Sequence, residues 1–260
     1  MSGRNTLFSP VKNFLLEAGE IAHFTWKFFR EGFKPPYEWG ELMRQSFEIG
    51  YRSIPLVSFT AFIMGLVITI QSHPALEVFG AESWLPSIVS VSLVREITPV
   101  ITALICAGKI GSSIGAEIGS MKVTEQIDAM EVSGTNPFKY LVVTRVLSTT
   151  LMIPLLVIFG DAVALYGGFL GVNIRGTTSL HLFWEQVFNK LTFGDVFPSI
   201  IKSVFFGFVI GIVGSYKGYT TSNGTEGVGR SANAAVVISS FIVFIVDLLA
   251  AQLSDILHLT

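Results

Sequence analysis

Five long apolar runs constrain the fold of this sequence more than any other feature. The first, from Ile54 to Ile70, has no charged residue, and the others cover residues 97–113, 141–170, 196–216 and 232–253. A helix needs about 20 mostly apolar residues to cross about 30 Å of hydrocarbon. Half of all residues are hydrophobic and only 14% are charged. The chain is therefore predicted to be an all-α integral membrane protein with five transmembrane helices.

The second apolar run is preceded by two adjacent charged residues, Arg95 and Glu96, and contains Pro99. A proline inside a helix removes a backbone hydrogen bond and kinks or breaks the helix. We therefore predict a short entering segment, followed by a helix that is interrupted near membrane depth or starts again after the pair.

Lys and Arg residues are concentrated on one side of the predicted spans. Seven precede the first span and others follow the second and fourth spans, whereas the opposite loops contain only Arg175 and Lys190. Positively charged loops remain in the cytoplasm. The N-terminus is therefore predicted to be cytoplasmic, and the C-terminus periplasmic or otherwise outside.

Residues 1–52 are predicted to form interfacial and elbow helices ahead of a transmembrane domain at residues 53–256. In the first helix, apolar residues such as Ile21 and Phe28 recur near helical spacing, while charged residues such as Lys27 take other faces. A helix of this kind can lie in the membrane surface.

Several function classes have no support in the sequence. The net charge is −2 without a basic cluster, which argues against nucleic-acid binding. Lys109 follows a glycine, but Ala103 stands where a phosphate loop needs its first glycine. Cys106 is the sole cysteine and the four histidines are scattered, so no metal site or catalytic residue is predicted. We therefore do not expect the chain to be an enzyme.

Two stripes of glycine recur at spacings of three and four residues, which places small residues on one helix face. The stripes are Gly108, Gly111, Gly115 and Gly119, and Gly207, Gly211, Gly214 and Gly218. Such stripes allow close helix packing, either within one chain or across a dimer face. The sequence leaves both interpretations open.

The polar segment 117–136 separates the second and third spans. If it is helical, Met121, Glu125 and Asp128 share one face. A solvated loop helix would not need its four apolar residues, Met121, Ile127, Met130 and Val132. The segment is therefore predicted to dock in a groove of a soluble partner.

The same region carries a recognisable pattern. AEIGSMKVTEQIDAME, preceded by LVREITPVITALICAGKIGSSIG, resembles the MlaE family of ABC-transporter permeases. The resemblance continues through NPFKYLVVTRV, IIKSVFFGFVIG and GVGRSANAAVVISS, and covers the chain from about Ile49 to its C-terminus.

This resemblance implies a homodimeric permease in a bacterial inner membrane, which moves phospholipid between that membrane and the outer envelope and so supports outer-membrane lipid asymmetry. It implies two cytoplasmic ATPase subunits that hold ATP and Mg, and a periplasmic MCE-domain protein; a small regulatory subunit on the ATPase is left open. The chain itself is expected to bind no cofactor. In this family, residues 121–131 correspond to the coupling helix that contacts the ATPase, here with Met121, Glu125, Gln126, Asp128 and Met130.

Charged residues within the spans are the remaining candidates for function, because an unpaired charge there costs about 3 kcal/mol or more. By resemblance, five match charged positions of the family: Arg95, Glu96, Lys202, Asp247 and Arg230. We hypothesise that Arg95 and Glu96 line the outer mouth of a lipid cavity at the dimer centre. Its apolar walls are predicted to include Leu66, Ile70, Leu76 and Val78. The structural alternatives are mutual neutralisation of Arg95 and Glu96, and snorkelling of Lys202 to the headgroups.

Two other functions are compatible with these residues. An ion-coupled secondary transporter would carry protons on Asp161, Asp247 or Glu96. A non-transporting membrane scaffold for an ATPase would not depend on the charged residues at all. No internal repeat is evident, and five spans do not divide into equal halves, which favours the ATP-driven permease.

Overall fold

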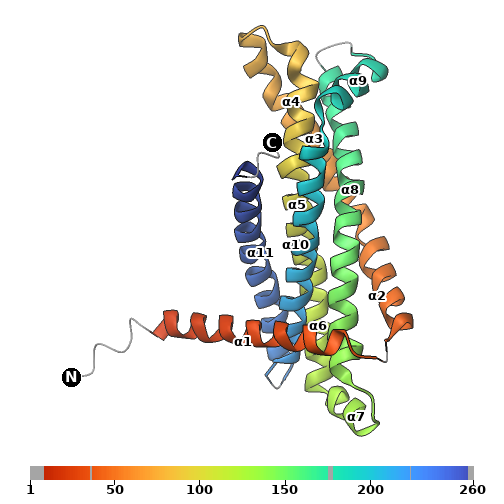
Figure 1. Ribbon diagram of the computed structural model, residues 1–260, viewed down its shortest axis with the longest axis vertical. Coiled ribbons are helices and arrows are strands. Elements are labelled where there is room, and N and C mark those ends of the chain that lie inside the picture. The colour runs from red at the N-terminus through yellow and green to blue at the C-terminus, as the bar shows by residue number, and fades with distance from the viewer. Residues whose placement is uncertain (1–8, 36, 175–177, 223, 257–260) are drawn as a thin grey trace, which may run out of the picture.

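The computed structural model describes residues 9–35, 37–174, 178–222 and 224–256, and within these ranges all regular structure is helical (Figure 1). The first helices are α1 (Ser9–Gly32), α2 (Trp39–Tyr51) and α3 (Ile54–Val78). The second span consists of η1 (Glu82–Trp84), α4 (Leu85–Ser92), η2 (Leu93–Ile97), α5 (Thr98–Cys106), η3 (Ala107–Gly111) and α6 (Ser112–Val123). The remaining helices are α7 (Gln126–Val132), η4 (Phe138–Val143), α8 (Thr144–Asn173), α9 (Leu180–Lys190), α10 (Phe193–Tyr219) and α11 (Thr225–Ile256).

The prediction of five transmembrane helices is confirmed. The described residues contain five helical segments long and apolar enough to cross a membrane, and each coincides with one of the predicted runs. In Figure 1 these segments form an elongated bundle, with α9 near one end and α7 at the other.

The second span differs from the prediction because its helix is not broken at the charged pair. Residues 82–123 form one helical path, in which Leu93–Ile97 make a wide π-helical turn just before Pro99. Proline cannot donate the hydrogen bond that its position in an α-helix requires, and a π-turn absorbs this mismatch without ending the helix. Arg95 and Glu96 lie within this turn.

Helix α8 is central to the bundle and packs against α2, α3 and α10, while α10 also packs against α6 and α11. The buried core between these helices includes Ile110, Ile153, Phe206 and Ile210. A side chain at Gly207 would meet the backbone of Thr149 at 2.5 Å. These helices therefore approach each other with their backbones nearly in contact.

Most of the two glycine stripes pack within the chain. Gly207 and Gly211 face α8, and Gly214 faces the backbone of Gly111 on η3. Gly108 differs, since nothing lies within 4 Å of the position that its side chain would occupy. Of the two interpretations, helix packing within one chain therefore holds for these glycines, and Gly108 is the exception.

Helix α1 lies across the bundle near the end that carries α7 (Figure 1). Phe24 and Phe28 are buried, and the ring of Phe24 packs edge-on against Phe138 and Tyr216. The Trp26 side chain is 70% exposed. The amphipathic helix therefore buries part of its apolar face against its own bundle and leaves other aromatic residues uncovered.

Candidate functional site

Three of the predicted charged residues meet inside the bundle. The Lys202 ammonium nitrogen on α10 lies 2.6 Å from Glu96 Oε2 on η2 and 2.9 Å from Asp247 Oδ1 on α11. We call these three residues the charged triad. Each comes from a different one of the five membrane-spanning segments of the structure, and the π-turn at η2 directs Glu96 toward α10.

The charged triad lies well inside the membrane-spanning part of the fold. Lys202 follows the first residue of α10 by nine positions, and Asp247 precedes the last residue of α11 by nine. At 1.5 Å per residue, each is about 14 Å from its helix end. The headgroup region is only about 5–7 Å thick on each side, so helix ends at the membrane surface would place the triad at hydrocarbon depth.

Burial differs sharply between the members of the triad. The Lys202 side chain is 4% exposed, whereas the side chains of Asp247 and Glu96 are 21% and 40% exposed. A buried ammonium is tolerated because two carboxylates accept its hydrogen bonds. Two negative charges around one positive charge leave an excess of negative charge on the open side of the site.

Asp161 adds a polar group near the triad. In the sequence analysis it was considered only as a proton carrier of an ion-coupled transporter. Its carboxyl lies beside Thr98, two residues after Glu96 in the chain. Even so, Asp161 Oδ1 and Thr98 Oγ1 are both buried without a hydrogen-bond partner in the described part of the chain. A buried polar atom without a partner is unfavourable by about 1–3 kcal/mol, so this pocket is polar but incompletely satisfied.

Arg95 and Arg230 do not join the triad. The suggestion that Arg95 and Glu96 neutralise each other is wrong, because Glu96 pairs with Lys202, and no ion pair of Arg95 is found among the described residues. Snorkelling of Lys202 is also wrong, because its ammonium is buried. Arg230 forms a weak ion pair with Glu226, at 3.8 Å. Arg230 precedes Asp247 by 17 residues on α11, so it lies about 26 Å from Asp247 along the helix.

The predicted apolar walls lie on α3, which packs against α8, α4 and α5. Leu66 and Ile70 are partly buried, Leu76 packs on a cluster that includes Leu85 and Val89, and Val78 is 82% exposed. Neither of the two grooves found on the described part of the chain is lined by these residues or by the triad. Their role in a lipid cavity stays a prediction.

The segment predicted to contact an ATPase is not a single helix. Helix α6 ends at Val123, and Glu125 adopts a left-handed backbone conformation with φ of 59° before α7 begins at Gln126. The expectation that Met121, Glu125 and Asp128 share one helical face is therefore wrong. A non-glycine residue in this conformation marks a sharp turn between the two helices.

The apolar residues of this segment pack against the protein itself. Ile127 is 1% exposed, and Met121 and Met130 contact the core cluster, so they need no partner to cover them. The apolar argument for docking thus fails for three of its four residues, and only Val132 is left 91% exposed. Apart from Val132, the exposed side chains of residues 125–132 are mostly polar and include Glu125, Gln126 and Asp128, the last paired with Lys122 at 3.1 Å.

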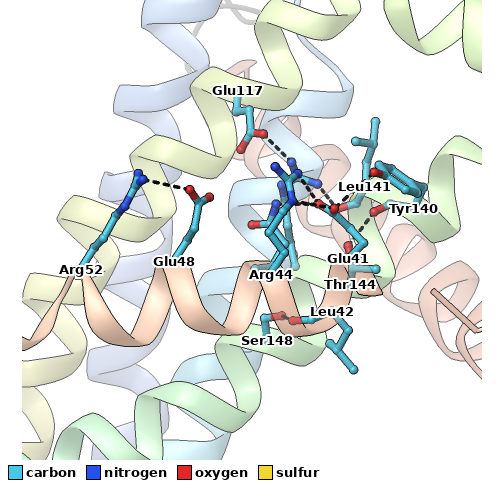
Figure 2. Close-up of polar contacts among 12 residues, drawn as sticks. Glu41, Leu42, Arg44, Glu48, Arg52, Glu117, Tyr140, Leu141, Thr144 and Ser148 are labelled. Carbon is cyan, nitrogen blue, oxygen red and sulfur yellow. Dashed lines mark hydrogen bonds and ion pairs between the residues drawn. The ribbon is translucent and has the colours of Figure 1, made fainter. Parts of the chain in front are cut away.

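A polar network near this end of the bundle was missed in the sequence (Figure 2). Arg145 is 1% exposed and donates hydrogen bonds to Leu141 O at 3.0 Å and to Glu117 Oε1 at 2.7 Å. Glu41 accepts hydrogen bonds from Arg44 at 2.7 Å and from Tyr140 at 3.2 Å. The sequence offered one signal for this network, because Arg145 is a charged residue four positions after the start of the apolar run at residues 141–170. The network ties α6 to the start of α8 through Arg145, and α2 to η4 through Tyr140.

Comparison with known proteins identifies the family. Residues 42–253 match the family described as Permease MlaE. The chain belongs to this family. The match covers all five spans, the charged triad and α7, so the triad is part of the family's permease domain.

Relatives of this family member include ABC-transporter permeases from several organisms. The chain is 38% identical to a probable ABC transporter permease protein of Rickettsia typhi, with 92% of this chain and 93% of the relative covered. It is 39% identical to a probable ABC transporter permease protein of Synechocystis, over 76% and 75% of the two chains. It is 32% identical to the intermembrane phospholipid transport system permease protein MlaE of Haemophilus influenzae, over 79% of each. The chain is thus a multi-pass membrane protein and an ABC-transporter permease subunit.

Proposed function

We propose that this permease moves phospholipid across or out of a bacterial inner membrane as a homodimer driven by a separate ATPase. The name of the Haemophilus influenzae relative supports phospholipid as the cargo. ATP and Mg would be held by the ATPase, and this chain would bind no cofactor. A periplasmic MCE-domain protein, and a small regulatory subunit on the ATPase, complete the proposed assembly.

The observation that carries this proposal is the exposure of Glu96 within a membrane-spanning helix. Its side chain is 40% exposed while it pairs with a lysine that is almost fully buried. A carboxylate facing lipid tails is strongly disfavoured, so such groups face a bundle interior or a water-filled cavity. A second copy of the chain that covers this side would convert the open side of the triad into a polar cavity.

The surface of α11 beside the triad is suited to contact with a second copy of the chain. Helix α11 carries Asp247 and leaves large apolar side chains such as Phe244 and Leu248 more than half exposed. A cavity with these apolar walls and a charged triad offers contacts to both parts of a phospholipid. The acyl chains need apolar walls, and the charged headgroup needs polar partners at membrane depth.

Energy is proposed to enter through the end that carries α7. Helix α7 protrudes from the bundle there (Figure 1), and its outward residues are mostly acidic or polar. Pairing of Glu125, Gln126 and Asp128 with basic groups of an ATPase would transmit closure of the ATPase dimer to α6. On this proposal the N-terminus is cytoplasmic and the C-terminus periplasmic.

The ion-coupled alternative has one observation in its favour, the buried carboxyl of Asp161 with its unpartnered oxygen. The names of the relatives favour the ATP-driven mechanism instead. The two are separated by reconstituting the permease with its co-encoded partners in vesicles and following labelled phospholipid. The ATP-driven permease requires transfer to stop when ATP is replaced by a non-hydrolysable analogue. Transfer that continues without ATP and follows an imposed proton gradient would favour the ion-coupled mechanism.

A further inference from the structure

A groove on the outer surface of the bundle, to which no residue of the charged triad contributes, has the form of a lipid-binding site. It encloses about 860 Å³ between the end of α1, the start of α2, and one face each of α8 and α10. Its walls include Leu147, Leu151, Val204 and Phe205, which are 37–56% exposed. We call it the elbow groove.

No residue of the triad lines the elbow groove, and η2 and α11, which carry Glu96 and Asp247, contribute nothing to its walls. On α10, Val204 and Phe208 point about 200° and 240° around the helix from Lys202, whereas Phe205 lies about 60° from it. The groove therefore shares α10 with the triad but has walls of its own. The inference drawn from it does not depend on the proposed transport function.

One end of the elbow groove is polar and aromatic. Its rim includes Lys34, Glu38, Lys139, Tyr37 and Trp39. The rings of Tyr37 and Trp39 lie 6.0 Å apart, and both residues are more than half exposed. Exposed Tyr and Trp residues beside lysines are typical of the level of lipid headgroups.

Lys139 is held in place at this rim. Its ammonium donates hydrogen bonds to the backbone carbonyls of Lys34 and Pro35, both at 3.0 Å. An ammonium has three N–H groups, and in the described part of the chain these two carbonyls account for two of them. The third can donate to an anion that enters the groove. A phosphate oxygen is a strong acceptor for such a donor.

The length of the elbow groove matches one leaflet of a bilayer. From Lys139 at the rim to Leu151 on the wall, the chain advances 12 residues along η4 and α8, which is about 18 Å. Half of the hydrocarbon thickness is about 15 Å. A polar rim at headgroup level therefore continues into an apolar wall as long as one acyl chain.

We propose that the elbow groove holds one phospholipid from the leaflet on the α1 side, with its phosphate at Lys139 and an acyl chain against Leu151 and Val204. The lipid would fill the angle between α1 and α2 and support the position of the interfacial helix. Ordinary boundary lipid is the alternative occupant, and it would contact every exposed apolar residue in proportion to its exposure.

The two occupants are separated by photo-crosslinking with a phosphatidylethanolamine that carries a diazirine on one acyl chain. The full chain is reconstituted in vesicles, irradiated and mapped by mass spectrometry. A bound lipid predicts labelling of residues 143–151 and 204–208 about tenfold above equally exposed positions elsewhere on α8. Labelling that simply follows exposure overturns the proposal. ATP is not added, so failure of transport would not affect the result.

Matched variants sharpen this test. Leu151→Trp fills the elbow groove, whereas Leu155→Trp changes a residue on the same helix that is equally exposed but does not line it. Leu151→Trp should lower groove labelling about tenfold and Leu155→Trp should not. Val204→Trp blocks the opposite wall and should repeat the loss if Leu151→Trp folds poorly. Equal labelling by a diazirine diacylglycerol, which lacks the phosphate, would also contradict the proposed contact with Lys139.

Discussion

The ammonium nitrogen of Lys202 lies 2.6 Å from Oε2 of Glu96, although 106 residues separate them in the chain. Asp247 approaches the same ammonium from a third helix, at 2.9 Å. One buried cation thus holds two carboxylates at membrane depth. Its removal would leave two like charges together without compensation, which makes Lys202 the member of the triad on which stability depends most.

Lys202→Met is predicted to lower the free energy of unfolding by about 3 kcal/mol, the low end for a broken buried pair, because it leaves two partly exposed carboxylates unpaired beside each other. Adding Glu96→Gln and Asp247→Asn to the same chain should recover part of this loss. The measurement is the unfolding of purified variants in mild detergent. Lys190→Met, at an exposed lysine of α9, is the control and should change stability by less than about 0.5 kcal/mol. A triple variant as unstable as Lys202→Met would contradict this account.

Gly65→Ala is predicted to destabilise the bundle by about 3 kcal/mol, near the upper end for overpacked sites. The added methyl group would lie 1.9 Å from the Ala164 carbonyl oxygen, so α3 and α8 would have to separate. Gly108→Ala adds the same group where nothing lies within 4 Å, and alanine is the better helix former there. Thermal unfolding of both variants tests the contrast. If the two melting temperatures fall equally, the close contact at Gly65 is not as described.

Glu117→Gln is predicted to cost about 2 kcal/mol, because it removes the only carboxylate that pairs with the buried guanidinium of Arg145 among the described residues. The matched control is Glu226→Gln, whose partner Arg230 is exposed and 3.8 Å away. That change should be nearly neutral, as is usual for surface ion pairs. Equal effects in urea unfolding of the two variants would show that the network in Figure 2 does not stabilise the fold.

Glu125→Gly is predicted to preserve the turn between α6 and α7, while Glu125→Val disrupts it. Glycine adopts φ of 59° freely, whereas other residues are disfavoured there by about 1–2 kcal/mol and β-branched residues more. The measurement is proteolysis at residues 123–126 in purified protein, where Val should increase cleavage and Gly should not. Equal cleavage of both variants would indicate that the backbone conformation at Glu125 is unimportant.

The five spans could be predicted because the length of an apolar run reports directly on membrane crossing. The charged triad was predicted only as a set of candidates, since sequence separation carries no information on which helices become neighbours. Glu96 was adjacent to Arg95 in the chain, yet the π-turn directs it to Lys202 instead. No residue pattern before Pro99 distinguished such a turn from a broken helix.

The segment at residues 117–136 shows a second limit of sequence reasoning. Its apolar residues fitted a docking face, but apolar character does not reveal which surface covers a side chain. Ile127 is buried by the chain's own core, and the turn at Glu125 changes the face on which Asp128 lies. Arg145 was overlooked because the apolar run around it was interpreted as a uniform span.

The central claim is that the carboxylates of the charged triad form part of the path of a phospholipid headgroup. It is tested most directly by ATP-driven transfer of labelled phospholipid in vesicles that contain the permease with its co-encoded partners. Glu96→Gln keeps the side-chain shape and leaves Lys202 paired with Asp247, so the complex should still assemble, and it should lower transfer by about tenfold or more. Glu82→Gln, at an exposed carboxylate on η1, should transfer at the wild-type rate. Wild-type transfer by the Glu96→Gln variant would contradict the account.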